Sequence, residues 1–349
     1  MTILEGEFRE ILRLNYLAAL NQEIPGDIVE LSQGNFLSVL EKALDWQIGP
    51  FQPEPNLGFT KVAQLSDPTG IGWTSSSIFN PSIIEEADEL HLFYRAAVKK
   101  ESLGSRIGHA IYSPENGWVN LNDPAIFPSE PNEALSTEDP KVYRIAPRRF
   151  IMFYNGVWRA DKEAIATYQK PFGDIACDIK YAVSEDLISW EKRGLVVPYE
   201  ISRLWAKGAV IPRDGFGNAV KINGEYLMFL SEGCGGSQFI GRSSDAIDWS
   251  FEQETYLTLP PQMGRHIYEV ATAVINGDRM ILDFMYQDND GKHAGAQALY
   301  DVNNPRKPLD LAVGATLSWG GLIKYRNRWT MAQGWDAPSG TEQIFFYVS

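Results

Sequence analysis

The segment ELHLFYRAA, residues 89–97, is an apolar run that ends in an aromatic residue followed by polar and small residues. Four later segments share this form, at intervals of about 50–75 residues: RFIMFYNGV (149–157), EYLMFLSEG (225–233), RMILDFMYQD (279–288) and RWTMAQGWD (328–336). Short runs rich in aromatic and branched residues, bounded by Gly, Asn, Asp and Pro, are typical of β-strands. The recurrence indicates one β unit used five times.

Each of the five segments has a strand-like neighbour on both sides. Before them, each across a tight turn, stand NPSIIEEAD, DPKVYRIAPR, NAVKINGE, EVATAVINGD and GGLIKYRN. Asn-Gly at 223–224 and 276–277 is a favoured two-residue hairpin turn, because both residues tolerate positive φ. After them stand SRIGHAIYS, CDIKYAVS, SQFIGRSS, AGAQALYD and EQIFFYVS. Two of these continue into a shared Ser-x-Asp-x-Ile-x-Trp pattern, whose Trp190 and Trp249 we interpret as blade core.

Five such units predict an all-β fold, a five-bladed β-propeller over residues 59–349. A single blade cannot bury both faces of its sheet, whereas five blades stacked around an axis can, and closing the ring protects the strand edges. A β-sandwich is the alternative architecture for the same strands.

Residues 1–58 have a different character and predict an N-terminal helical extension with a linker. In EFREILRLNYLAALNQ the apolar residues recur at helical spacing, and a second helical stretch, DIVELSQGNFLSVLEKALDW, follows a Pro-Gly break. FQPEPNLGF then resembles a linker. We expect the helices to pack on the propeller or on another subunit.

Charge and composition exclude several classes of function. The net charge of −14 argues against nucleic acid and anionic membrane surfaces as partners, since both require a basic footprint. No apolar run approaches the ~18 residues of a membrane helix, and no signal-peptide pattern opens the chain, so the expected location is cytoplasmic. The two cysteines and four histidines show no metal-ligand spacing. We therefore expect neither a metal nor a cofactor.

Propeller topology brings certain residues together. The innermost strand of each blade begins near the axis, and the second strand returns there, so residues at these two points should converge in one funnel. Blade three is ambiguous between Lys207 and Asn218. The full expected set is Asn80, Arg95, Glu138, Asp139, Asn155, Lys207 or Asn218, Ser231, Glu232, Tyr268, Glu269, Tyr286 to Asp288, Trp319, Trp335 and Asp336.

Carboxylates beside aromatic residues suit carbohydrate chemistry. Acetal cleavage needs an acid for the leaving oxygen and a second group that helps water to attack. Aromatic faces cover the apolar side of a sugar ring, and Asn, Asp and Arg bind its hydroxyls. A carboxyl beside others in a cleft tends to have a raised pKa, as an acid requires. Ser231 has no histidine candidate nearby, so a serine triad is not expected.

The order of several motifs resembles glycoside hydrolase family 130, whose five-bladed propellers act mainly on β-mannosides. FNPSI and LHLFYRA look like the family's Asn-Pro strand start and Tyr-Arg strand end. STEDPKVYRI is similar to its Glu-Asp-Pro-Arg signature, with Lys141 in place of Arg. WAKGAVIPR with KINGEYLMF, and ALYDVNNPRKP, resemble its later elements. The resemblance spans residues 75–340, and N-terminal helices that aid oligomerisation are also found in the family.

The resemblance implies roles for individual residues. Asp139 corresponds to the family's proposed general acid, acting directly or through a sugar hydroxyl, with Glu138 as its support. Asn80 and Arg95 would contact the sugar, and Lys207 matches a family lysine, although Gly208 replaces the Asp that follows it. Asn155, Tyr268 and Asp336 complete the substrate-binding set expected from the funnel.

Departures from the family pattern favour hydrolysis. The family's phosphorylases bind phosphate through an Arg and a His in regions that read MFLSEG and ILDFMYQDND here. Phosphate needs clustered cationic donors, and Glu232, Glu269 and Asp288 would repel it. The expected protein is therefore an inverting hydrolase of a β-mannoside or related oligosaccharide, with Glu269 or Glu232 assisting water. A phosphorylase, a non-catalytic sugar-binding propeller and an arabinan- or fructan-cleaving propeller are the alternatives.

Overall fold

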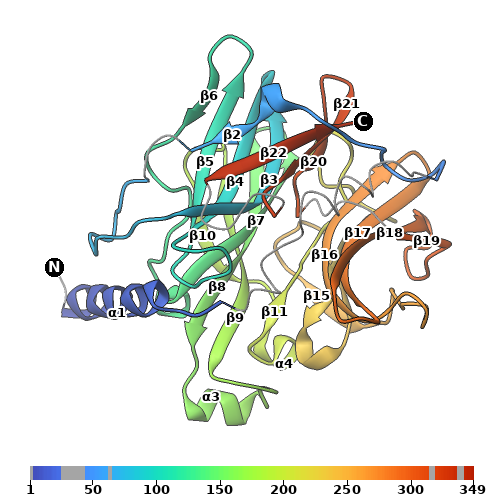
Figure 1. The fold of residues 1–349 in the computed structure, drawn as a ribbon. Helices are drawn as coiled ribbons and strands as arrows, with labels where there is room; N and C mark the ends of the chain where they lie inside the picture. The colour runs from blue at the N-terminus through green and yellow to red at the C-terminus, as the bar shows by residue number, and fades with distance from the viewer. Residues whose placement is uncertain (1–2, 25–43, 62–64, 314–318, 336–341) are drawn as a thin grey trace.

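The computed structural model describes residues 3–24, 44–61, 65–313, 319–335 and 342–349. Its strands form successive antiparallel sheets arranged around an axis, which is a five-bladed β-propeller (Figure 1). The all-β prediction is confirmed, and the sandwich alternative is wrong.

Three blades are regular four-stranded sheets in which each strand pairs with its neighbour in sequence. From the axis outward, blade one is β3 (Ser77–Glu86), β4 (Glu89–Ala97), β5 (Arg106–Ser113) and β6 (Gly117–Asn120); blade two is β7 (Ser136–Ala146), β8 (Arg149–Arg159), β9 (Ile175–Ser184) and β10 (Glu191–Leu195); blade four is β16 (Gly264–Asn276), β17 (Arg279–Asp288), β18 (His293–Asp301) and β19 (Asp310–Val313).

Blade three departs from this plan. Its main sheet comprises β12 (Tyr226–Leu230), β14 (Phe239–Ser243) and β15 (Ser250–Gln253). On its axial side, β12 pairs with Val210 through an isolated bridge at Phe229. The NAVKING segment, which the repeat predicted as the first strand of this blade, does not take that place. The innermost element is therefore the WAKGAVIPR region. Its start, β11 (Ala206–Lys207), pairs with β13 (Glu232–Gly233) at the axis.

Blade five combines strands from two distant parts of the chain. β20 (Leu322–Tyr325), β21 (Arg328–Gln333) and β22 (Gln343–Val348) come from the C-terminal region. Both β1 (Gln52–Pro53) and β2 (Phe59–Thr60) pair with β22. Part of FQPEPNLGF thus provides an outer strand of the propeller, and it includes the short helix η2 (Pro55–Leu57). This pairing covers a sheet edge that would otherwise be exposed.

The tight turns use residues with positive φ. In blade three Asn223 and Gly224 both have positive φ, as predicted for an Asn-Gly turn. In blade four Asn276 instead pairs with Arg279, so the turn is Gly277–Asp278, one residue later than predicted. The shift follows from the longer inner strand, which keeps Asn276 in the ladder.

The apolar core lies in clusters within and between the blades. One cluster joins Tyr143 and Phe153 of blade two to Met228 and Leu230 of blade three. Sheet faces that meet in this way are covered on both sides, which explains the continuous apolar runs of the repeat.

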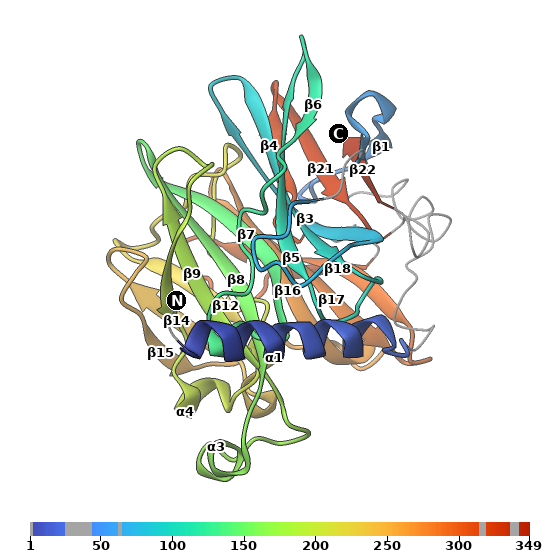
Figure 2. The ribbon, with the colours of Figure 1, turned by 90° about the vertical axis from the view of Figure 1, so that its left-hand side faces the viewer.

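Helices lie outside the ring. The longest described one is α1 (Ile3–Leu20), which runs along the outside of the propeller (Figure 2). Short helices occur at α3 (Lys162–Thr167), α4 (Tyr199–Ser202), η3 (Pro131–Glu133) and η4 (Cys234–Gly236). Most of the second predicted helical stretch lies outside the described residues. None of the described helices combines the length and apolar character of a membrane span.

α1 is attached to blade one and to the start of blade two. The Tyr16 hydroxyl hydrogen-bonds Thr74, and the Asn15 amide donates to the carbonyl of Ala134. Leu12, Tyr16 and Ala19 are buried by this contact, whereas apolar side chains on the other side of the helix are exposed, namely Ile11, Leu14, Leu17 and Leu20. The extension therefore packs on the propeller and leaves an apolar outer face.

Candidate active site

Two proline-linked bulges direct side chains toward the axis. Asn80 precedes Pro81 on β3, and Asp139 precedes Pro140 on β7. Both residues have positive φ, +46° and +54°, and the strand register shifts beside each. A bulge re-aims a side chain, and proline is tolerated there because the ladder bond is already interrupted. The Asn80 amide donates to Asp139 Oδ1 at 2.7 Å, which joins the two bulges.

A cavity of about 350 Å³ lies at this end of the axis. Residues from all five blades line it: Asn80, Arg95, Glu101, Asp139, Lys207, Glu232, Tyr268, Glu269, Met285, Gln287, Gly291, His293, Trp319 and Trp335. Ten residues of the expected funnel are in this set, namely Asn80, Arg95, Asp139, Lys207, Glu232, Tyr268, Glu269, Gln287, Trp319 and Trp335. Strand starts and strand ends from different blades therefore converge on a single cavity.

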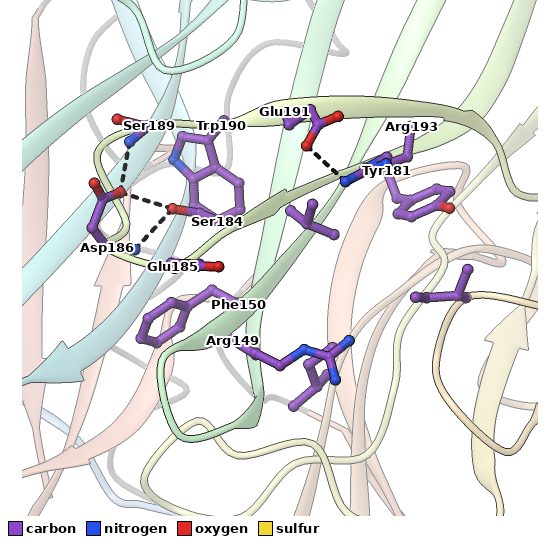
Figure 3. A pocket seen from close by; sticks show the side chains of 13 residues that line it. Arg149, Phe150, Tyr181, Ser184, Glu185, Asp186, Ser189, Trp190, Glu191 and Arg193 are labelled. Carbon is purple, nitrogen blue, oxygen red and sulfur yellow. Dashed lines mark hydrogen bonds and ion pairs between the residues drawn. The ribbon is translucent and has the colours of Figure 1, made fainter.

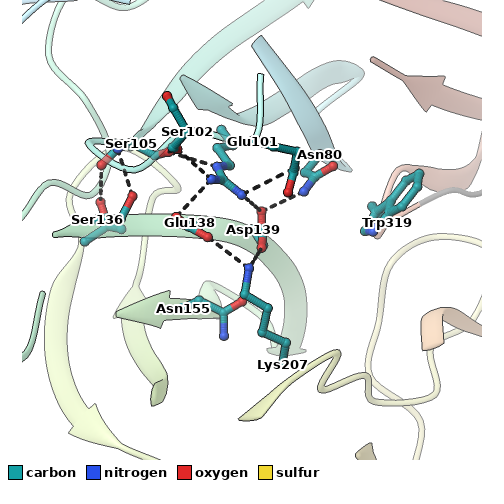
Figure 4. A network of polar contacts seen from close by, with 12 residues as sticks. Asn80, Glu101, Ser102, Ser105, Ser136, Glu138, Asp139, Asn155, Lys207 and Trp319 are labelled. Carbon is teal, nitrogen blue, oxygen red and sulfur yellow. Dashed lines mark hydrogen bonds and ion pairs between the residues drawn. The ribbon is translucent and has the colours of Figure 1, made fainter. Parts of the chain in front are cut away.

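Two cations hold Glu138 and Asp139 (Figure 4). Arg95 donates from Nη2 to Glu138 Oε1 at 2.9 Å and from Nη1 to Asp139 Oδ1 at 3.3 Å. Lys207 Nζ donates to the other oxygen of each, at 3.0 Å and 3.1 Å. All four side chains are largely buried. Each carboxylate therefore bridges both cations. The four groups are largely shielded from water, and buried ion pairs are strong when every charge has its hydrogen-bond partners.

The pKa of Asp139 shifts opposite to the direction expected from the sequence. Burial disfavours its ionised form, but Lys207 and Arg95 outweigh burial and hold its pKa well below the usual range. Neighbouring carboxyls alone would raise this pKa, and the two cations reverse the direction of the shift. Asp139 is consequently an anion at neutral pH.

Glu232 has the opposite character. Burial raises the pKa of Glu232 to about 8; Lys207 opposes this shift, and the neighbouring Glu269 and Asp139 add to it. It is therefore protonated at neutral pH. The site thus contains an ionised carboxylate, Asp139, and a neutral carboxylic acid, Glu232, on adjacent blades. Acid–base catalysis uses such a difference in protonation state.

Glu269 belongs to a second hydrogen-bond network at the cavity wall. Lys141 Nζ donates to Glu269 Oε1 at 2.9 Å, and Trp319 Nε1 donates to Oε2 at 3.1 Å. Lys141 reaches from blade two to blade four, so the residue that departs from the family signature anchors a candidate catalytic carboxylate. Gly208 leaves the required room: a Cβ there would lie 2.7 Å from Glu269 Cγ.

Three predicted substrate-binding residues are not on the cavity wall. Glu138 lies behind it, bound to Arg95 and Lys207. Asn155 donates its amide to the carbonyls of Asp178 and Ala206 and lines a separate hollow of about 10 Å³. Asn155, on β8, supports the wall through its bond to Ala206 of β11. Glu138, on β7, supports it through Arg95 and Lys207. Asp336 lies outside the described residues.

Sequence reasoning missed Glu101. It follows β4 in a loop, has a φ of +61°, and lies 3.8 Å from Arg95 Nη1 at the cavity wall (Figure 4). Burial raises its pKa, against the attraction of Arg95 and Lys207. The repeat could not identify it, because it stands beyond the strand end. Its position after the Tyr-Arg strand end was the available signal.

The remaining wall is aromatic and apolar. Tyr268 packs against the rings of His266 and His293, with ring centroids 4.8 and 4.7 Å away. Trp319 and Trp335 stack at 5.4 Å. Within the described part of the chain, no group of three or more His, Cys, Asp or Glu side chains is arranged to hold a metal. The cavity combines aromatic surface with carboxyl groups, the combination that recognises and cleaves sugars.

Comparisons with known proteins agree with this chemistry. The model of glycoside hydrolase family 130, described as beta-1,4-mannooligosaccharide phosphorylase, matches residues 57–278. A 1,2-beta-oligomannan phosphorylase of Thermoanaerobacter sp. (strain X514) is 24% identical over 253 residues, which cover 68% of this chain and 73% of the relative.

Two solved structures share the fold. A putative glycosidase from Bacteroides thetaiotaomicron superposes with a TM-score of 0.68 at 18% identity, covering 88% of this chain and 98% of the other. The second comes from work showing that the GH130 family of mannoside phosphorylases contains glycoside hydrolases that target beta-1,2 mannosidic linkages in Candida mannan. Its TM-score is 0.66 at 18% identity, with 88% and 95% of the two chains covered.

Proposed function

The chain belongs to glycoside hydrolase family 130, and we propose that it is an inverting hydrolase of β-mannosidic linkages. The observation that carries this proposal is the pairing of the cavity's cations. Arg95 and Lys207 are each bound to Glu138 and Asp139, and Lys141 is bound to Glu269. Phosphate would have to compete with these carboxylates for its donors, whereas water needs no cationic site.

The acid step falls to the pair of Glu232 and Asp139. An acid must hold a proton at the working pH, and Glu232 does so. The charge of Asp139 contributes to keeping that proton on Glu232, and Asp139 lies at a bulge on the wall of the same cavity. The prediction from the family, in which Asp139 itself is the proton donor, differs from this assignment and can be tested against it.

The base step falls to Glu269. Its carboxylate is fixed by Lys141 and Trp319 on blades other than its own. Inversion requires acid and base on opposite sides of the anomeric carbon, with space for water between the sugar and the base. Glu232 comes from blade three and Glu269 from blade four, and both line the same cavity.

Product analysis with and without phosphate tests hydrolysis. The enzyme is incubated with β-1,2- and β-1,4-mannobiose, and the products are separated by ion chromatography. We expect mannose at equal rates in both conditions, released first as the α-anomer in an NMR time course. Phosphate-dependent release of mannose 1-phosphate would instead establish phosphorolysis, the alternative favoured by the phosphorylases among the relatives.

The pH dependence of two variants separates the acid assignments. Activity should fall as pH rises through about 8, because Glu232 then loses its proton. In Asp139→Asn the anion that raises the pKa of Glu232 is gone and Lys207 remains, so the alkaline limb moves to lower pH and activity persists in acid. Glu232→Gln should be inactive at every pH. Loss at every pH in Asp139→Asn, with activity retained in Glu232→Gln, would make Asp139 the donor.

A second copy of the chain is the proposed partner for the outer face of α1. Ile11, Leu14, Leu17 and Leu20 expose 39–53% of their surface on a helix that is already packed on its other side. Light scattering of the wild type should give a mass above 39.2 kDa, and Leu14→Glu with Leu17→Glu should give the monomer. A monomeric wild type at micromolar concentration would contradict this.

A further inference from the structure

Two stacked tryptophans link two of the carboxyl groups of the site, Asp139 and Glu269. Trp319 donates its Nε1 to Glu269 Oε2 at 3.1 Å. Trp335 donates its Nε1 to Asn80 Oδ1, and the Asn80 amide donates to Asp139 Oδ1 at 2.7 Å. The two indole rings lie 5.4 Å apart and are inclined by 20°. A continuous path therefore runs from Asp139 through Asn80 and both indoles to Glu269.

The backbone of each tryptophan is clamped by other blades. The residue after Trp319, Gly320, donates its N–H to Thr272 of blade four, and Arg213 Nη2 donates to its carbonyl at 2.7 Å. Lys100, from the loop after β4, donates from Nζ to the carbonyl of Gly334 at 3.1 Å. These anchors come from blades one, three and four, so the stack is fixed relative to the whole ring and not to blade five alone.

Little of either indole is accessible for stacking on a sugar. Trp319 is 2% and Trp335 7% exposed, each ring faces the other, and Phe79 packs edge-on against Trp335 at 6.1 Å. Their N–H groups are directed at the carboxylate networks. This differs from an aromatic sugar platform, which presents an open face.

We propose that Trp319 and Trp335 are positioning residues that fix the separation of Asp139 and Glu269. This rests on the proposed function, in which Asp139 supports the acid Glu232 and Glu269 is the base. Asp139 and Glu269 belong to blades two and four, which share no strand pairing. The stacked tryptophans of blade five link the two, because Trp319 hydrogen-bonds Glu269 and Trp335 hydrogen-bonds Asn80, which in turn hydrogen-bonds Asp139. Positioning matters for the rate, since a displacement of about 1 Å can cost ~10²-fold.

Phenylalanine variants separate hydrogen bonding from stacking, since they keep an aromatic ring and lose the N–H. Trp319→Phe should lower kcat about 10–100-fold and leave the KM for mannobiose within about twofold. Trp335→Phe should act in the same way but more weakly, because Asn80 still contacts Asp139. Trp118→Phe is the matched control: it loses an indole hydrogen bond to the carbonyl of Leu57, at 2.9 Å, away from the cavity.

Thermal unfolding and a crystal structure complete the test. Positioning requires the Glu269 carboxylate to move in crystals of Trp319→Phe while the Tm falls no further than in Trp118→Phe. An unchanged kcat with Glu269 in place would overturn the inference. If the wild type cleaves no mannoside and Glu269 still moves, the proposed function fails and the positioning role stands.

Discussion

Two hollows of different character lie at opposite ends of β7. The larger, about 770 Å³, lies at the hairpin end and is lined by residues of blade two and by Ile247 of blade three (Figure 3). The smaller, about 350 Å³, lies at the axial end, where Asp139 is. Size alone would favour the first as a binding site. The state of the polar groups in each leads to the opposite conclusion.

Polar groups in the larger groove stabilise their own turns. Asp186 accepts from the backbone N–H groups of Ile188 and Ser189, which lowers its pKa, and Trp190 donates to the carbonyl of Leu187. The Ser-Asp-Trp turn of blade three, at residues 243–249, repeats these bonds. This accounts for the Ser-x-Asp-x-Ile-x-Trp pattern as a structural element of the blades. In the axial cavity, by contrast, charged side chains from different blades are buried against one another.

Replacing a carboxylate should have its largest effect in the axial cavity. Glu269→Gln removes the proposed base and should lower kcat by about 10²–10⁴-fold. Glu191→Gln in the groove breaks an exposed ion pair with Arg193 and should leave kcat unchanged. Steady-state kinetics on mannobiose measure both. Equal losses in the two variants would remove the distinction between the hollows.

Removing a cation from the axial cavity and one from the groove compares the two hollows through the free energy of unfolding. Lys207→Met leaves Glu138 and Asp139 short of one partner each, and breaking such a buried pair costs about 3–5 kcal/mol. Arg193→Met breaks a surface pair worth at most about 1 kcal/mol. The midpoints of urea unfolding should differ accordingly. A Lys207→Met midpoint equal to that of Arg193→Met would show that the axial network contributes nothing to stability.

Two glycines with positive φ allow backbone strain to be separated from contact with Glu269. A Cβ at Gly208, with φ +64°, would meet Glu269 Cγ at 2.7 Å, whereas one at Gly194, with φ +108°, would meet nothing within 4 Å. Both alanine variants strain the backbone, by about 1 kcal/mol. Only Gly208→Ala should also displace Glu269 and lower kcat, by roughly tenfold. If kcat falls equally in Gly194→Ala, backbone strain and not contact with Glu269 is the cause.

The smallest expected effect concerns substrate contact. Glu101 lines the cavity and can accept hydroxyl hydrogen bonds, which Glu101→Gln weakens without removing the side chain. KM for mannobiose should rise about 3–10-fold with kcat nearly constant, since a typical hydrogen bond contributes about 0.5–1.5 kcal/mol. Glu185→Gln, in the groove, is the control. A constant KM would place Glu101 outside the substrate contacts.

Strand alternation and turn chemistry were readable from the chain because they depend on neighbours in sequence. The five repeated segments predicted the blades, and the strand starts and ends predicted that Asn80, Arg95, Asp139 and Glu269 would meet. The first strand of blade three was predicted at the NAVKING segment, whereas the structure pairs Val210 with β12. Val210 was missed because it forms only an isolated bridge and its segment does not match the repeat. Glu101 was missed for a related reason, since loop residues follow no period.

Protonation states and side-chain anchoring were decided by the tertiary structure alone. The chain identified Asp139 and Glu232 as carboxyls of one site. Only the tertiary structure makes the first an anion, through Arg95 and Lys207, and keeps the proton on the second, through burial and the nearby carboxyls. Likewise Lys141 and Trp319 reach Glu269 from 128 and 50 residues away. Burial and charge act through space, so a sequence fixes which groups are present while the closed ring determines which of them interact.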